Sequence, residues 1–138
     1  MGNSLTSRTI DETKAFAKKL ASRLAPGNIV CLHGDLGAGK TTFSKSLIAE
    51  LVSTVSEDDV TSPTFITMNL YEHVAHFDLY RLKRKEEFIL GGFDEYLEEP
   101  YIAIIEWPSV IDGLLPKEVI HIKIEVTDSG ERVFHETV

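Results

Sequence analysis

The chain is poor in cysteine, in positive charge and in long apolar runs. Cysteine occurs once in 138 residues, which rules out an internal disulfide and makes the cytoplasm the expected compartment. Lys and Arg number 14 against 22 Asp and Glu, a net charge of −8, which disfavours direct, non-specific contact with nucleic acid. No apolar run approaches the length of a membrane span, and we expect neither a leader nor a membrane anchor.

The remaining composition is that of a folded protein. Hydrophobic residues make up 43% and charged residues 26%, which is ordinary for a globular protein and argues against wholesale disorder. The length predicts a single domain over residues 1–138, large enough for a full core. It leaves little room for a second, substrate-binding domain.

One glycine-rich stretch carries the strongest functional signal. Residues 34–41 read Gly-Asp-Leu-Gly-Ala-Gly-Lys-Thr and match the phosphate-binding pattern G-x-x-x-x-G-K-(S/T), the P-loop. The apolar run 29–32 precedes it like a buried strand, and Phe43, Leu47 and Leu51 follow at helical spacing. Strand, loop and helix are the context that this motif needs, so we expect the chain to bind a nucleoside triphosphate.

The residue types in the loop explain its chemistry. Gly34, Gly37 and Gly39 can take positive φ, which lets backbone N–H groups curl around phosphate oxygens at a helix N-terminus. Lys40 can reach the β- and γ-phosphates, and the hydroxyl of Thr41 can bind Mg²⁺. The predicted ATP-binding residues are Gly34, Asp35, Leu36, Gly37, Ala38, Gly39, Lys40, Thr41 and Thr42.

A second carboxylate is needed beside such a loop to orient the metal ion. Glu106 follows the unbroken apolar run 101–105, which is typical of a strand buried on both faces. An acid at the carboxyl end of that strand is expected in the magnesium site together with Thr41, because a buried strand has no other need for it.

Two further candidate residues have more than one possible role when judged from the sequence alone. Asp78 follows residues 74–77, near the end of the extended run 74–79, and could hold the attacking water, bind metal through water, or cap its own turn. Thr64 follows Pro63 and could place a hydroxyl near the γ-phosphate, although satisfying its own turn is the simpler role.

Other residues near these motifs are less informative. Trp107 could be a surface aromatic for a partner or base, or a cover on the sheet edge. His73 and His76 do not share a helical face, so a transition-metal site is not expected there. Arg81 is the only arginine near a motif that could serve as an arginine finger.

The remaining elements follow from periodicity and turn residues. Thr9 and Glu12 form a capping box that opens a helix, which we expect to run to Pro26-Gly27. Residues 65–70 and 74–79 predict an antiparallel hairpin, and residues 83–90 predict a helix stopped by Gly91-Gly92. The predictions also include an acidic loop at 56–59, a short helical turn at 93–97, and strands at 101–105, 119–126 and 132–137.

Four motifs in this order closely resemble the bacterial TsaE family, small ATPases required for tRNA threonylcarbamoyladenosine synthesis. They are residues 34–43, Ser62-Pro63-Thr64-Phe65, residues 76–82 (His-Phe-Asp-Leu-Tyr-Arg-Leu) and Ile105-Glu106-Trp107-Pro108. The resemblance extends from about residue 11 to residue 116, and the four motifs together are far more specific than the P-loop alone.

The resemblance implies a three-layer α/β P-loop NTPase-like fold with a mixed, partly parallel sheet. It also implies that Lys40 and Thr41 hold phosphates and Mg²⁺, that Glu106 is the second magnesium acid, and that Asp78 and Thr64 belong to the catalytic site. The implied partners are a TsaD-like transferase and a TsaB-like paralogue, whose synthase complex is cycled by ATP hydrolysis. The implied contact with tRNA is mainly indirect, which agrees with the acidic charge.

Two departures from the family pattern and two competing functions remain. Gly91 stands where the family usually has a large apolar residue, and the Glu72-His73 turn looks short; neither touches a proposed catalytic group. One competitor is a small-molecule kinase, which would need an arginine-bearing lid and an acceptor pocket. The other is a non-hydrolytic, nucleotide-dependent binding module.

Overall fold

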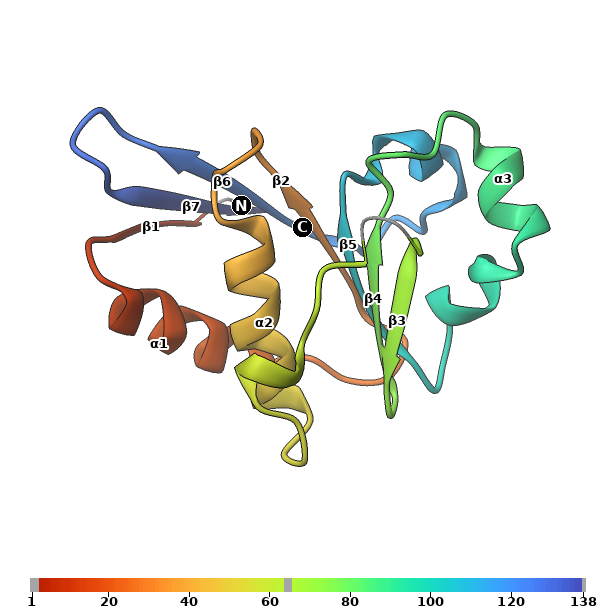
Figure 1. The fold of residues 1–138 in the computed structure, drawn as a ribbon, viewed down its shortest axis with the longest axis horizontal. Coiled ribbons are helices and arrows are strands. Elements are labelled where there is room, and N and C mark those ends of the chain that lie inside the picture. The colour runs from red at the N-terminus through yellow and green to blue at the C-terminus, as the bar shows by residue number, and fades with distance from the viewer. Residues whose placement is uncertain (1–2, 64–65, 138) are drawn as a thin grey trace.

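The computed structural model describes residues 3–63 and 66–137. Its strands form a seven-stranded sheet in the order β1-β7-β6-β2-β5-β4-β3 (Figure 1). The strands are β1 (Asn3–Ser7), β2 (Ile29–His33), β3 (Met68–Tyr71), β4 (Val74–Asp78), β5 (Ile102–Glu106), β6 (Ile120–Val126) and β7 (Arg132–Thr137). Strands β4, β5, β2 and β6 are parallel neighbours, and the pairs β3/β4, β6/β7 and β1/β7 are antiparallel. The predicted mixed, partly parallel sheet is confirmed.

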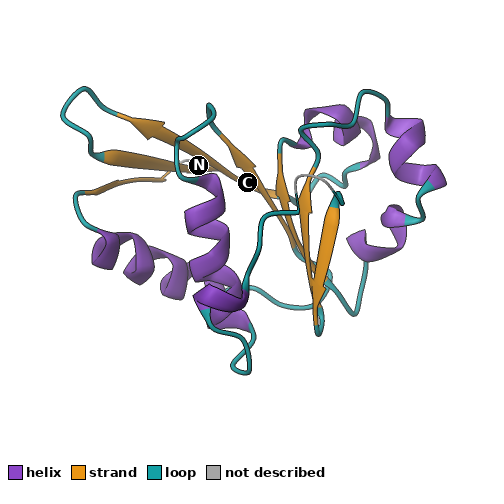
Figure 2. Cartoon of the chain, viewed as in Figure 1, coloured by secondary structure: helices purple, strands orange, loops and turns teal. Residues whose placement is uncertain are grey.

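Helices lie on both faces of the sheet (Figure 2). They are α1 (Ile10–Ala21), α2 (Lys40–Leu51) and α3 (Lys85–Leu90), with the 3₁₀ segments η1 (Glu57–Asp59), η2 (Phe93–Leu97) and η3 (Pro108–Leu114). One apolar cluster joins the sheet to α1 and α2 through Phe43, Leu47 and Phe134. A second cluster, around Phe77 and Phe88, joins the opposite face to α3, η2 and η3. The predicted three layers are therefore present.

Strand β5 shows why an unbroken apolar run marks the middle of such a sheet. Successive side chains of a strand point to opposite faces, so Ile102 and Ile104 pack in the α1/α2 cluster while Ala103 and Ile105 pack in the other. The same alternation turns Glu106 toward α2. The predicted strand at 101–105 is confirmed, and β5 begins and ends one residue later than expected.

Helix α1 begins as predicted and ends earlier. Thr9 is its N-cap, with Oγ1 accepting from the N–H of Glu12 at 3.1 Å, while the Glu12 carboxylate accepts from the N–H of Arg8. The helix ends at Ala21 rather than near Pro26, because Arg23 and the next residue donate to carbonyls three positions back and tighten the last turn.

Three other elements differ from what the sequence predicts. Strand β3 begins at Met68, because the N–H groups of Ile66 and Thr67 both turn back to the carbonyl of Pro63. Strand β1 was not predicted; its polar sequence becomes a strand by pairing with β7. The acidic loop at 56–59 is instead a capped 3₁₀ turn.

The Gly91-Gly92 stop signal is confirmed, since α3 ends at Leu90 and Gly92 takes a φ of 76°. A Cβ at position 91 would lie 2.5 Å from the Phe93 ring, so the departure at Gly91 leaves room for that ring. No helix in the described part of the chain is both long and apolar enough to span a membrane.

Candidate functional site

The glycine loop joins the carboxyl end of β2 to the first turn of α2. Gly34, Gly37 and Gly39 have φ values of 151°, 82° and 102°, which confirms the predicted positive φ at all three. Gly39 is the N-cap of α2 and takes the left-handed conformation. The nine predicted ATP-binding residues all lie in this loop or in the turn that follows it, at the positively polarised end of the helix.

The side chain of Lys40 folds back over the loop. Nζ donates to the carbonyl oxygens of Gly34 and Asp35, the latter at 2.9 Å, and lies 3.9 Å from the centre of the Trp107 ring. Burial lowers the pKa of the Lys40 ammonium group, and the negative charges of Glu106 and Asp35 partly oppose that shift. A phosphate group would replace these weak acceptors with a charged one.

Thr41 and Glu106 meet at the base of the loop, as the motif reading expected. Thr41 Oγ1 donates to Oε1 of Glu106 at 3.0 Å. Oε2 of the same carboxylate accepts from Ser44 Oγ at 3.2 Å and from His76 Nε2 at 2.6 Å. Glu106 is only 1% exposed, so these contacts replace the water that an ionised carboxylate would otherwise hold.

Asp78 lies beside Glu106 on the neighbouring parallel strand, where the two residues are register partners. It lines the same pocket as Lys40 and Thr41. One carboxylate oxygen of Asp78 accepts from the N–H of Tyr80 at 3.0 Å, which is the turn cap that the sequence allowed, and the same residue also borders the pocket. Thr64, the remaining predicted catalytic residue, lies outside the described residues.

Trp107 forms one wall of the site. It has a positive φ of 57°, which is uncommon for a non-glycine residue. Its ring packs 4.9 Å from that of Tyr80 and faces Lys40. The pocket that it borders measures about 290 Å³ and is lined by Leu36, Gly37, Gly39, Lys40, Thr41, Thr42, Asp78, Glu106, Trp107 and Arg132.

Arg132 is a site residue that sequence reasoning missed. Its Nε donates to the carbonyl of Ala38 at 3.1 Å, and a Cβ at Gly39 would lie 2.7 Å from the same nitrogen. No motif marks this arginine; only the return of β7 beside the loop brings it there. By contrast Arg81, the arginine singled out in the sequence, is exposed and does not line the pocket described above.

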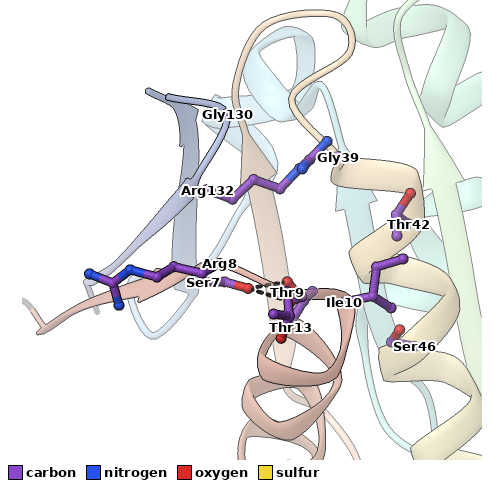
Figure 3. Close-up of a pocket in the computed structure, with 10 residues that line it drawn as sticks. All are labelled: Ser7, Arg8, Thr9, Ile10, Thr13, Gly39, Thr42, Ser46, Gly130 and Arg132. Carbon is purple, nitrogen blue, oxygen red and sulfur yellow. Dashed lines mark hydrogen bonds between the residues drawn. The ribbon is translucent and has the colours of Figure 1, made fainter. Parts of the chain in front are cut away.

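A second pocket of about 260 Å³ adjoins the first and shares Gly39, Thr42 and Arg132 with it (Figure 3). It lies between the start of α1, the side of α2 and the β6/β7 turn. Figure 3 shows Arg132 reaching toward Gly39 while Thr42 comes from α2. The remaining lining residues are Ser7, Arg8, Thr9, Ile10, Thr13, Ser46 and Gly130.

The groups at the base of the loop are oxygen donors. Within residues 3–63 and 66–137 no three His, Cys, Asp or Glu side chains are grouped to hold a metal ion. A hydroxyl and a carboxylate oxygen 3.0 Å apart, at Thr41 and Glu106, are the kind of ligands that Mg²⁺ takes while keeping several waters.

Comparison with known proteins points to one family. The family model of the threonylcarbamoyl adenosine biosynthesis protein TsaE matches residues 7–134. The tRNA threonylcarbamoyladenosine biosynthesis protein TsaE of Rickettsia felis is 41% identical over 127 residues, covering 89% of this chain and 72% of that protein. The protein of the same name from Bacillus subtilis is 38% identical over 126 residues, covering 88% and 77%. The crystal structure of YdiB from Bacillus subtilis has a TM-score of 0.79 and 32% identity, covering 100% of this chain and 86% of that one. The chain belongs to the TsaE family.

Proposed function

We propose that this protein is a Mg²⁺-dependent ATPase required for threonylcarbamoyladenosine modification of the adenosine beside the anticodon of tRNA. The observation that carries the proposal is the 3.0 Å contact between Thr41 of the P-loop and Glu106 of the neighbouring strand. This pairing joins the two protein groups that a P-loop ATPase uses at its metal ion. Membership of the TsaE family supports the assignment of this activity to tRNA threonylcarbamoyladenosine biosynthesis.

Thr41 and Glu106 are the residues that would hold Mg²⁺. When bound, the ion would neutralise charge on the β- and γ-phosphates. Lys40, freed from the carbonyls of Gly34 and Asp35, would bind the γ-phosphate. The backbone N–H groups of the glycine loop and the start of α2 would hold the β-phosphate.

Hydrolysis is then an in-line displacement. A water oxygen forms a bond to the γ-phosphorus, the bond from that phosphorus to the bridging oxygen breaks, and ADP leaves with the bonding electrons. The carboxylate of Asp78, which lines the same pocket as Glu106, would orient the water and accept its proton. Slow turnover alone and faster turnover with partners are expected.

The second pocket is the proposed place for the nucleoside half of ATP, because it opens from the loop at Gly39 and Thr42. Arg132 borders both pockets and adds positive charge next to the phosphates. The net charge of −8 favours reaching tRNA through partners, for which we propose a TsaD-like transferase and a TsaB-like paralogue.

ATP hydrolysis by the purified chain, with and without these two partner proteins, tests the proposal. We expect slow hydrolysis that needs Mg²⁺ and rises when both partners are present. Glu106→Gln should retain ATP binding and lose hydrolysis, and it should not support the tRNA modification. A Glu106→Gln variant with intact biological function would contradict hydrolysis as the role of the site.

A further inference from the structure

His76 is a buried polar side chain whose neighbours on the same face are mixed: Val74 and Ile104 are apolar, while Asn69, its register partner on β3, is polar. It lies on β4 and its side chain is completely buried. Its register partner on β5 is Ile104, and Val74 and Ile104 both belong to the apolar cluster under α1 and α2. Burying an imidazole is unfavourable unless a hydrogen bond compensates for it.

The compensating contact is with Glu106. His76 Nε2 lies 2.6 Å from Oε2 of that carboxylate, and both side chains are almost fully buried, at 0% and 2% exposed. Because a carboxylate only accepts, Nε2 carries the hydrogen. His76 contacts Oε2 of the carboxylate, whereas Thr41 contacts Oε1.

The other ring nitrogen of His76 makes no hydrogen bond, among the described residues, that would explain the residue. Nδ1 of His76 is buried and has no hydrogen-bond partner among residues 3–63 and 66–137. A buried polar atom left without a partner destabilises the folded state. Among the described residues only Nε2 of His76 has a hydrogen-bond partner, and that partner is Glu106.

The two oxygens of Glu106 are used differently. Oε2 receives hydrogen bonds from His76 and from Ser44 at 3.2 Å, which fix the carboxylate from inside the protein. Oε1 contacts only the hydroxyl of Thr41 among the hydrogen bonds of the described residues, and Thr41 and Glu106 both border the pocket. This division leaves Oε1 and the Thr41 hydroxyl on the side where a cation would bind.

We propose that His76 is a positioning residue for Glu106: its Nε2 holds Oε2, so that Oε1 is presented beside Thr41 to the magnesium ion. The inference rests on the proposed function, because it takes Glu106 as the magnesium acid. Partners that orient metal-binding side chains typically change metal affinity by about 10- to 100-fold when removed. A residue needed only for folding would not produce a selective loss of this kind.

A matched pair of variants tests the role. His76→Gln places an amide N–H close to the position of Nε2, and His76→Met fills similar space with no donor. The measurement is calorimetric binding of a non-hydrolysable ATP analogue, in EDTA and across a Mg²⁺ titration, with thermal unfolding as a check of folding. We expect His76→Met to raise the Mg²⁺ concentration needed for tight analogue binding about 10-fold or more. Its analogue affinity in EDTA should stay within about twofold of the wild type. His76→Gln should restore the Mg²⁺ requirement to nearly that of the wild type.

The wild type and Glu106→Gln, measured in the same way, separate a failure of the proposed function from a failure of the proposed role of His76. If the wild type binds the analogue equally with and without Mg²⁺, the metal part of the proposed function is wrong and this inference falls with it. If the wild type needs Mg²⁺ and Glu106→Gln loses that need while His76→Met keeps it, the function stands and only the role of His76 is overturned. Equal impairment of the Gln and Met variants also overturns it. Should His76→Met fail to fold, Ser44→Ala is expected to weaken Mg²⁺ dependence in the same direction, and unchanged dependence there contradicts the proposal.

Discussion

The ammonium group of Lys40 lies against the face of the Trp107 ring, 3.9 Å from its centre. The same nitrogen donates to the carbonyls of Gly34 and Asp35. A cation over an indole is stabilised by the negative face of the ring. In this state the lysine is engaged by the protein itself, and it must leave these groups to reach a phosphate.

Trp107 should therefore report nucleotide binding. It is the only tryptophan of the chain, and its emission depends on the cation beside it. We expect addition of an ATP analogue with Mg²⁺ to change the emission of the wild type, whereas Lys40→Met should differ from it before addition and respond little afterwards. Lys18→Met, on α1, is the control that should respond like the wild type. An unchanged response of Lys40→Met would show that Lys40 does not move.

The requirement for glycine differs between two positions of the chain. A Cβ at Gly34 would lie 2.6 Å from the carbonyl oxygen of Ile124 on β6, at a φ of 151°. At Gly130, which has a φ of 85°, an added Cβ meets no atom of the described residues within 4 Å. Gly130→Ala thus tests backbone strain alone, and Gly34→Ala tests strain together with a clash against a neighbouring strand.

Urea unfolding should separate the two effects. We expect Gly130→Ala to lower the free energy of unfolding by about 1 kcal/mol, from the left-handed backbone. Gly34→Ala should cost about 1–3 kcal/mol more, because β6 is paired with β2 and cannot move aside freely. Equal losses for the two variants would mean that the loop shifts without disturbing β6.

The parts of the site that could be predicted are those written in contiguous sequence. The glycine loop depends on residues next to one another, and Glu106 is marked by the apolar strand that it ends. Their meeting also follows from a general rule, because carboxyl ends of adjacent parallel strands lie together. The strand order then places β5 beside β2, as the motifs require.

The parts that could not be predicted depend on register and on distant pairing. Arg132 bonds a carbonyl 94 residues away in sequence, through a hairpin whose position no local pattern gives. His76 reaches Glu106 only because β4 and β5 align with His76 opposite Ile104, and its spacing from His73 carries no information about that alignment. Strand β1 is polar, and its strand state comes from β7.

Arg23 and Glu136 form a two-point ion pair that should make stability depend on pH. The two guanidinium nitrogens lie 2.8 and 2.7 Å from the two carboxylate oxygens. The hydrogen bond from Arg23 lowers the pKa of Glu136 below its ordinary 4.5. A carboxyl with a lowered folded-state pKa stabilises the fold above the unfolded value, and that contribution is lost as the pH falls through the folded-state pKa.

Arg23→Ala should accordingly be less stable by about 1 kcal/mol near neutral pH. The difference from the wild type should shrink as the pH falls below 4.5, the ordinary pKa, and through the lower folded-state pKa of Glu136. Unfolding by urea across this range measures it. Lys123→Ala, which removes an exposed partner of Glu125, is the control with little expected effect. A difference that persists in strong acid would assign the loss to packing of the arginine stem.

Cys31 offers the opposite dependence on pH. The thiol is fully buried on β2, and burial, with a smaller contribution from Asp112, raises its pKa to about 12 from an ordinary 9.0. The folded state therefore keeps its proton above pH 9.0 while the unfolded chain loses it. Proton release on unfolding favours the unfolded state as the pH rises, by about 1.4 kcal/mol per pH unit for one group.

The difference in unfolding free energy between Cys31→Ala and the wild type should consequently become smaller in alkaline solution. Near neutral pH the variant should be less stable by about 1–2 kcal/mol, since it leaves a small cavity between Ile29 and Ile105 in the second apolar cluster. Above pH 9.0 the wild type loses the thiol contribution and the variant does not, so the two unfolding free energies should converge. A constant difference would mean that solvent reaches the thiol in the folded state. Labelling with a thiol reagent gives an independent check. If solvent reaches the thiol in the folded state, Cys31 should be modified without unfolding.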